Sequence, residues 1–245
     1  MKRFTVVVLL ITALVLSACN VTFNLPNTVR GSGKLSTETR TVSGFSRIVV
    51  NGSGDAQITQ GDSESLSIEA EDNILPLLTS DVVNGTLTLG FKNNTSVSTT
   101  RPIRYTISVK ALNSVEINGS GNTSVGNVQT DAMAMVVRGS GNISLASLQA
   151  TSLTVDDNGS GGLSVDGGKI TSLSATIAGS GSFSAANLEC QDAKVSIAGS
   201  GDVTVWAKGT LQGSIFGSGN VNYYGSPAVT QNVTGSGRVT SKGNK

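Results

Sequence analysis

The chain has 245 residues, which is enough for one or two domains of ordinary size. Charged residues make up 13% and aromatic residues 4%, and 30 residues are glycine. This composition excludes a coiled coil and a disordered chain, and it favours β-structure with many tight turns. The absence of histidine excludes Ser-His-Asp triads and histidine-bound zinc, and two cysteines cannot form a four-cysteine metal site.

The N-terminus has the organisation of a lipoprotein signal peptide, which we place at residues 1–18. Met1-Lys2-Arg3 is basic, the apolar run that follows is too short to span a bilayer, and Leu16-Ser17-Ala18-Cys19 resembles a bacterial lipobox. The resemblance implies that Cys19 is lipidated and anchors the chain on the outer face of a membrane. The alternative is an ordinary secretory signal followed by an unmodified cysteine. Residues 19–29 are expected to form a lipidated tether.

Neither the net charge nor the second cysteine indicates a particular function. Without Lys2 and Arg3, 15 of the 17 basic residues remain against 16 acidic ones, a net charge of −1. This balance gives no reason to expect nucleic acid as a partner. Cys190 is left as a lone thiol, and we expect it to be a small buried residue.

A repeated tripeptide organises the rest of the chain. Most copies of Gly-Ser-Gly follow one another at intervals of 18 to 21 residues, a period typical of solenoids. A single interval of 67 residues has room for about three further units. The nine copies start at positions 31, 52, 119, 139, 159, 179, 199, 217 and 235.

Apolar residues recur at fixed places around each copy. The residue two positions before the first glycine is valine or isoleucine in eight of nine copies, and Asp157 is the exception. Apolar residues also recur four and six positions after it. This period of two predicts strand, corner and strand, so that each repeat forms one coil and coils stack about 4.8 Å apart. We therefore predict an all-β fold, a β-helix or solenoid over residues 30–245, with a β-propeller as the alternative.

The region between residues 55 and 118 is less regular than the repeats. In chain order, its sequence predicts strands at 65–71, 86–91 and 103–109, a short helical turn within 73–81 and a hairpin turn at Asn84-Gly85. We expect this region to pair with or cap the first coils, because an open apolar edge at the end of a solenoid is a liability. The polar residues 241–245 are expected to protect the other edge.

Several motifs occur in a characteristic order along the chain. They are the Gly-Ser-Gly-Asn/Asp units, Phe45-Ser-Arg-Ile48, Asn84-Gly85-Thr86-Leu87 and Tyr224-Gly-Ser-Pro227. Together they resemble, over roughly residues 40–240, the family named "putative auto-transporter adhesin, head GIN domain". The resemblance implies a right-handed β-helix in the bacterial cell envelope, and it brings no family active site. The chain departs from the Asn/Asp pattern at Gly162, Ser182 and Arg238.

Two groups of polar residues are candidates for chemistry. Side chains that follow the corners are able to bind cations or sugar hydroxyls, but we interpret them as turn-stabilising. Asp156 and Asp157 are expected to lie in a locally shifted coil that leaves both solvated, because a buried unpaired carboxylate is costly. Together with Asp166, these two aspartates are the candidate residues for a glycan-cleaving site. The corner residues are Asp55, Asn122, Asn142, Asp202 and Asn220.

Trp206 and Tyr224 are the candidate surface-binding residues. Both stand seven positions after the first glycine of consecutive repeats. Alternation points both side chains outward, so they are expected to stack on neighbouring coils. Exposed aromatic pairs suit the faces of sugars or partner proteins. The alternative is that both pack under the C-terminal tail.

The sequence thus predicts a lipid-anchored protein of the bacterial cell envelope with an adhesin-like, structural or ligand-binding β-helical domain. We expect no catalytic residues, no metal and no cofactor. The expected partners are the membrane, through the lipid anchor, and glycans or envelope proteins. The alternatives are a polysaccharide lyase or hydrolase and an envelope sensor that binds a protein partner.

Overall fold

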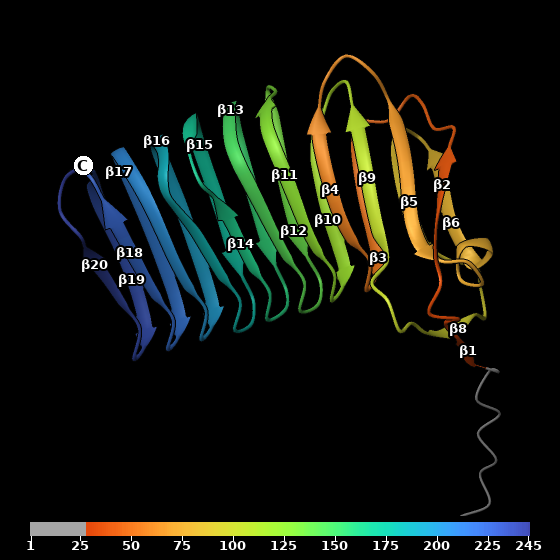
Figure 1. Cartoon of the computed structure of the whole chain (residues 1–245). Helices are drawn as coiled ribbons and strands as arrows, with labels where there is room; N and C mark the ends of the chain where they lie inside the picture. Colours follow the sequence, from red (N-terminus) through yellow and green to blue (C-terminus); the bar gives the residue numbers. More distant parts are fainter. Residues whose placement is uncertain (1–27) are drawn as a thin grey trace, which may run out of the picture.

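The computed structural model describes residues 28–245, and the chain is a β-solenoid of about 6 turns. Strands make up 69% of the residues and helix 1%, which confirms the all-β prediction. Figure 1 shows the coils lined up along one axis, with the N-terminal strands at one end and the C-terminus at the other. The predicted signal peptide, Cys19 and most of the tether lie outside the described residues. Thr28 and Val29, which we placed in the tether, belong to a strand.

The coils are held together by parallel strand pairs. Each strand pairs with the equivalent strand of the next coil, usually 18 to 20 residues further along the chain. The strands are β3 (Arg47–Gly52), β4 (Asp55–Gln60), β10 (Ser114–Gly119), β11 (Asn122–Gln129), β12 (Ala132–Val137), β13 (Asn142–Asp157), β14 (Gly162–Val165), β15 (Gly168–Ile177), β16 (Ser182–Gly199), β17 (Asp202–Gly217), β18 (Asn220–Tyr224), β19 (Ala228–Gly235) and β20 (Arg238–Ser241).

The predicted apolar columns form the core. Val137, Ile177 and Ile197 occupy equivalent places in the stack of coils and are fully buried. The positions four and six residues after the corner glycine are buried in the same way, as Leu163 and Val165 show. Stacking identical side-chain positions lets apolar residues cover one another along the whole axis, which is the main source of stability in such a fold.

The Gly-Ser-Gly corners stack directly on one another. From the corner at Gly119 onward, the serine N–H donates to the carbonyl of the first glycine on the coil before, as Ser200 does to Gly179 at 3.0 Å. Gly199 has a φ of +146°, and a Cβ placed there would lie 2.2 Å from the Gly179 carbonyl oxygen. Only glycine fits this position, because both the backbone angle and the space exclude a side chain.

The N-terminal strands, between residues 28 and 109, form one end of the solenoid. Its predicted strands are confirmed, and Asn84 and Gly85 both have positive φ in the tight turn between β6 and β7, as expected of the hairpin. The helical turn is shorter than expected, since its last residues belong to β6. The elements are β1 (Thr28–Arg30), β2 (Leu35–Arg40), β5 (Ser65–Glu71), the 3-10 helix η1 (Leu75–Leu77), β6 (Leu78–Val83), β7 (Thr86–Phe91), β8 (Ser96–Ser98) and β9 (Arg104–Val109).

The long interval between corners does not hold three stacked coils. β10 pairs directly with β3, so the corner at Gly119 lies on the corner at Gly52. The intervening residues go to the other side of that coil, where β7 pairs with β3 and β9 with β4. β5 then runs antiparallel to β9 and β2 antiparallel to β5. The expected cap on the first coils is therefore present, built from antiparallel strands.

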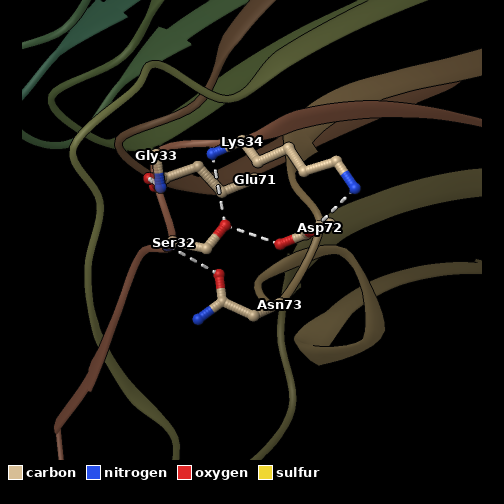
Figure 2. Close-up of polar contacts among 6 residues, drawn as sticks. All are labelled: Ser32, Gly33, Lys34, Glu71, Asp72 and Asn73. Atoms are coloured by element: carbon tan, nitrogen blue, oxygen red, sulfur yellow. Dashed lines mark hydrogen bonds and ion pairs between the residues drawn. The ribbon is translucent and has the colours of Figure 1, made fainter.

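The first Gly-Ser-Gly is not a corner of the solenoid. Gly33 N–H donates to the Glu71 carboxylate at 2.6 Å, and Ser32 N–H donates to the Asn73 side chain at 3.0 Å. Figure 2 shows the Ser32 hydroxyl, which donates to Asp72 at 2.5 Å and accepts from Lys34 N–H at 3.2 Å. We call residues 31–33 with Glu71, Asp72 and Asn73 the N-terminal clip, because these contacts tie the start of the domain to the end of β5.

The last coil has an open edge. All eight residues of β19 are exposed, including Val229 and Val233 of the apolar columns, at 38% and 36%. The polar tail does not cover this edge. It bonds back to the preceding coil, where Lys242 N–H donates to Tyr223 O at 2.8 Å. The two ends of the solenoid are thus built differently.

Candidate ligand-binding surface

Trp206 and Tyr224 lie side by side on the outer face of the last coils. Trp206 in β17 is the register partner of Tyr224 in β18, so their backbones are one strand spacing apart, about 4.8 Å. Both side chains are half-buried, and the two chain neighbours of Trp206, Val205 and Ala207, point into the core. The side chains of Trp206 and Tyr224 therefore point outward, as alternation predicts.

Lys245 covers part of this aromatic pair. Its Nζ lies 4.9 Å from the centre of the Tyr224 ring and 5.8 Å from that of Trp206, within cation–π range. The ammonium also donates to Ala186 O at 2.8 Å and to the Asn187 side chain. The tail thus touches the rings, as the alternative expected, but with a single long side chain. A hollow of about 250 Å³ remains, lined by Trp206, Lys208, Gly225, Ser226, Asn244 and Lys245.

A change in coil length creates this surface. The register between β16 and β17 shifts twice, once between Ala185 and Glu189 and once between Cys190 and Asp192. At the first shift β16 has three residues more than β17, and at the second β17 has one residue more than β16. The coil that starts at Gly199 is therefore two residues shorter than the one before it, 18 residues instead of 20. The three residues after Ala185 form a bulge within β16 as a result. The carbonyl of Ala186 in this bulge is the one that Lys245 reaches.

Charges beside the aromatic pair are paired with one another. Glu189, the register partner of Trp206, contacts Lys169 at 3.0 Å and Lys208 at 3.5 Å. The hydrogen bond from Lys169 is the main cause that lowers the pKa of Glu189, so this carboxylate stays ionised. Behind it, the Cys190 thiol donates to Trp206 O at 3.2 Å, and burial raises its pKa to about 12. Cys190 is a small buried residue, as predicted.

The polar residues after the corners form a ladder along one edge. Asp55 accepts from Asn122 N–H at 2.9 Å, and Asn142 both donates to Asn122 and accepts from Gly162 N–H, each at 2.7 Å. Asp202 repeats the arrangement by accepting from Asn220 N–H at 2.9 Å. These bonds link one coil to the next, so the side chains stabilise the stacking of the corners. The ladder is interrupted at Gly162 and Ser182, the positions where the pattern departs from Asn/Asp.

The expectation for Asp157 is wrong. The coil is not shifted: Asp157 pairs in register with Val137 and Ile177 and is completely buried. Its Oδ1 accepts from Gly159 N–H at 2.9 Å, while Oδ2 lies beside Gly181 without a partner, and burial raises the pKa of the carboxyl. The side chain fits because it takes the place of a valine or isoleucine. Asp156 points the other way, so the two aspartates do not form a pair that faces a glycan.

Two negative findings bear on other sites. Within residues 28–245, no three His, Cys, Asp or Glu side chains come together as a metal site would require. In the same residues, no helix is long and apolar enough to cross a membrane.

A sequence profile described as "Putative auto-transporter adhesin, head GIN domain" matches residues 44–227. This range covers more than half of the chain and includes the coils with both aromatic residues. The chain belongs to this family. The family description points to an extracellular or envelope protein, and it confirms the resemblance that the motifs indicate. No curated protein sequence matches the chain significantly.

Solved structures of three bacterial proteins share the fold of this head GIN domain protein. A "putative adhesin" from Bacteroides fragilis is 26% identical with a TM-score of 0.81, covering 89% of this chain and 100% of its own. A "putative adhesin" from Parabacteroides merdae is 25% identical with a TM-score of 0.68, covering 89% and 99%. A "putative lipid binding protein" from Parabacteroides distasonis, 24% identical with a TM-score of 0.71 over 89% and 99%, shows the fold alone.

The sequence predicted only some of the residues that form this surface. It identified Trp206 and Tyr224 from their spacing in the repeat. It missed Lys245 and Lys208, because the path of the tail and the register shifts decide where these side chains lie.

Proposed function

We propose that this head GIN domain protein is an adhesin-like binding protein of the cell envelope that holds glycans on the face of Trp206 and Tyr224. The observation that carries the proposal is the in-register aromatic pair beside a polar hollow. Aromatic rings pack against the C–H faces of sugars, and the lysines and Asn244 around the hollow are suited to their hydroxyl groups.

We also propose that Cys19 is lipidated and anchors the protein to a membrane. The support is the order of basic residues, apolar run and small residues before Cys19. A tether of about ten residues then separates the membrane from the N-terminal clip. Feeding cells labelled palmitate should label the protein, and Cys19→Ser should abolish the label and release the protein from the membrane fraction. Retention of label in that variant would disprove the anchor.

A glycan array tests the binding surface. The purified protein is compared with Trp206→Ala/Tyr224→Ala on cell-wall and host glycans. We expect the double substitution to weaken binding tenfold or more, since each ring contributes on the order of 1 kcal/mol. Phe216→Ala is the matched control, because Phe216 is an exposed aromatic residue of the same strand at another position. Equal binding by the protein and the double variant would exclude the aromatic pair.

The two alternative functions give different results in this assay. A polysaccharide lyase or hydrolase would shorten the bound glycan, which mass spectrometry of the eluted sugar detects. An envelope sensor would bind no glycan and would instead copurify with one stable protein after crosslinking in cells.

A further inference from the structure

The aromatic pair is the end of a longer row of outward side chains. Following the strand register from Trp206 back through the coils leads to Glu189 and then to Lys169. The same register continues onto two glutamines. In order along the axis, the row consists of Gln129, Gln149, Lys169, Glu189, Trp206 and Tyr224, one residue from each successive coil. We call it the axial row.

The axial row has the length and period of an extended polymer. Five register steps of about 4.8 Å give a row of about 24 Å. An extended chain of pyranose sugars advances by about the same distance with each unit. One sugar therefore meets one coil, and each unit meets a new side chain of the row. A compact ligand would contact only a few neighbouring residues of the row.

Each end of the axial row lies in a hollow. The aromatic end has the hollow beside Trp206 described above. The other end has a hollow of about 510 Å³ lined by Gln60, Asn127, Gln129, Ser147 and Gln149, among others. Gln60 holds this end in place, because its amide accepts from Gln129 N–H at 2.9 Å and donates to Gln129 O at 3.1 Å. The two hollows therefore mark the ends of one continuous face.

The chemistry of the row indicates neutral sugars. Glutamine amides offer a donor and an acceptor to each pair of hydroxyls, and the rings offer apolar faces. Glu189 lies in the middle and is already shared by Lys169 and Lys208, so the charges of the row largely compensate one another. A row built for an acidic polymer would present cations without a carboxylate among them.

We propose that an extended chain of neutral sugars binds along the axial row, from the Gln129 end to Tyr224. The proposal rests on the proposed function, because it takes the aromatic pair as a sugar site. It adds the class of ligand, its direction along the solenoid axis and two residues that bind it, Gln129 and Gln149. Both are exposed on neighbouring coils and paired in register.

The test is the dependence of affinity on chain length. Calorimetry is carried out on the full protein with linear chito-, cello- and manno-oligosaccharides of two to six units. We expect affinity to rise with every added unit up to five or six. Gln129→Ala/Gln149→Ala should weaken the hexasaccharides about tenfold and leave the disaccharides unchanged, since two hydrogen bonds are lost at the far end only.

The control is Gln212→Ala/Gln231→Ala, which removes two exposed glutamines that are not in the row. Equal affinity for disaccharides and hexasaccharides would overturn the axial row while leaving the aromatic site. Preference for oligogalacturonates would overturn the assignment to neutral sugars. Absence of binding by every oligosaccharide, neutral or acidic, would overturn the row and the proposed glycan function together.

Discussion

Residues 31–33 and the corners of the coils share the sequence Gly-Ser-Gly but meet different partners. At a corner such as Gly199-Ser200-Gly201, the serine N–H donates to the backbone of the coil before. In the N-terminal clip, the N–H groups of Ser32 and Gly33 donate to side chains instead. The tripeptide itself supplies a flexible, slim backbone. What it binds depends on whether another coil lies beneath it.

The two regions also bury one carboxylate each, in opposite ways. Glu71 in the clip accepts from Gly33 N–H, Thr100 N–H and the Thr100 hydroxyl, at 2.6, 2.9 and 2.5 Å. Asp157 in the coils accepts one bond and leaves Oδ2 unpartnered. In the coils, backbone N–H groups donate to the neighbouring strand, so few remain for a side chain. The irregular region has free donors to offer.

The largest effect is expected from a corner glycine. Gly199→Ala would place a Cβ 2.2 Å from Gly179 O at positive φ, so the coils must separate locally. We expect a loss of ~3 kcal/mol in unfolding free energy. Denaturant unfolding measures it, with Gly126→Ala as control because the nearest atom there is 3.7 Å away. Gly33→Ala should cost only ~1 kcal/mol, since its space is open. Equal losses at Gly199 and Gly33 would contradict the distinction between corner and clip.

Next in size is a local effect at the clip. Glu71→Gln replaces one acceptor oxygen with an amide NH₂ group, which must face either Gly33 N–H or Thr100 N–H. At least one of these donors then loses its acceptor, so the clip should open locally. Hydrogen exchange should show faster exchange of the Gly33 and Thr100 amides and no change in the coils. Glu69→Gln, on the exposed side of the same strand, is the control. Unchanged exchange at both Gly33 and Thr100 would mean that Glu71 does not hold the clip.

The clip should also depend on pH. The hydrogen bond from the Thr100 hydroxyl is the main cause that lowers the pKa of Glu71. A folded-state pKa below the ordinary glutamate range stabilises the protein above that range, and the effect is lost as pH falls through the folded pKa. The protection factor of the Gly33 amide, its exchange relative to the unfolded chain at the same pH, should therefore fall in acid in the natural protein.

The third prediction is a gain in stability. Asp157→Val restores the apolar column and should raise the unfolding free energy at pH 7 by ~1–3 kcal/mol. Because burial raises the pKa of Asp157, stability of the natural protein should fall as pH rises from the ordinary aspartate range through the folded pKa. This fall should be absent in the variant. Asp156→Ala is the control on the outer face, and a loss of stability in Asp157→Val would show that the bond to Gly159 outweighs burial.

The smallest effect is expected from the corner ladder. Asn142→Ala removes the bonds to Asn122 and Gly162 N–H, both at an exposed edge, and should cost ~0.5–1 kcal/mol. Thermal unfolding against Gln212→Ala measures it. Ser182→Asn should conversely gain a few tenths of a kcal/mol by filling a gap in the ladder. A larger loss at Asn142 than at Gly199 would reverse the order of effects proposed for the coils.

Much of the fold was predictable from the sequence because the repeat is a local signal. The period of about 20 and the alternation around each corner predicted the coils, the buried columns and the outward direction of Trp206 and Tyr224. The strands at 65–71 and 86–91 followed from alternation as well. Each of these features depends on neighbours a few residues apart, where strand geometry alone decides which side chains point inward.

Other features depended on contacts between distant segments. The cost of burying an unpaired carboxylate predicts that Asp157 is solvated. The structure instead buries it, because β13 keeps a regular register over its 16 residues and Asp157 falls on the inner face. The interval before Gly119 has room for about three units by length, whereas its strands β7 and β9 lie on the far side of β3 and β4. The Gly-Ser-Gly at 31–33 was counted as a corner. In each case the deciding neighbour lies many residues away.

By itself, the sequence determined that the chain is an all-β solenoid with glycine corners and an apolar interior, because a repeated pattern satisfies the same local geometry on every coil. Only the tertiary structure decided how its ends are built, which carboxylates are buried, and that Gln129 through Tyr224 form one axial row. These properties depend on strand register and on small shifts in coil length, such as the loss of two residues before the last coils. Such shifts move side chains onto new neighbours without altering the repeat pattern.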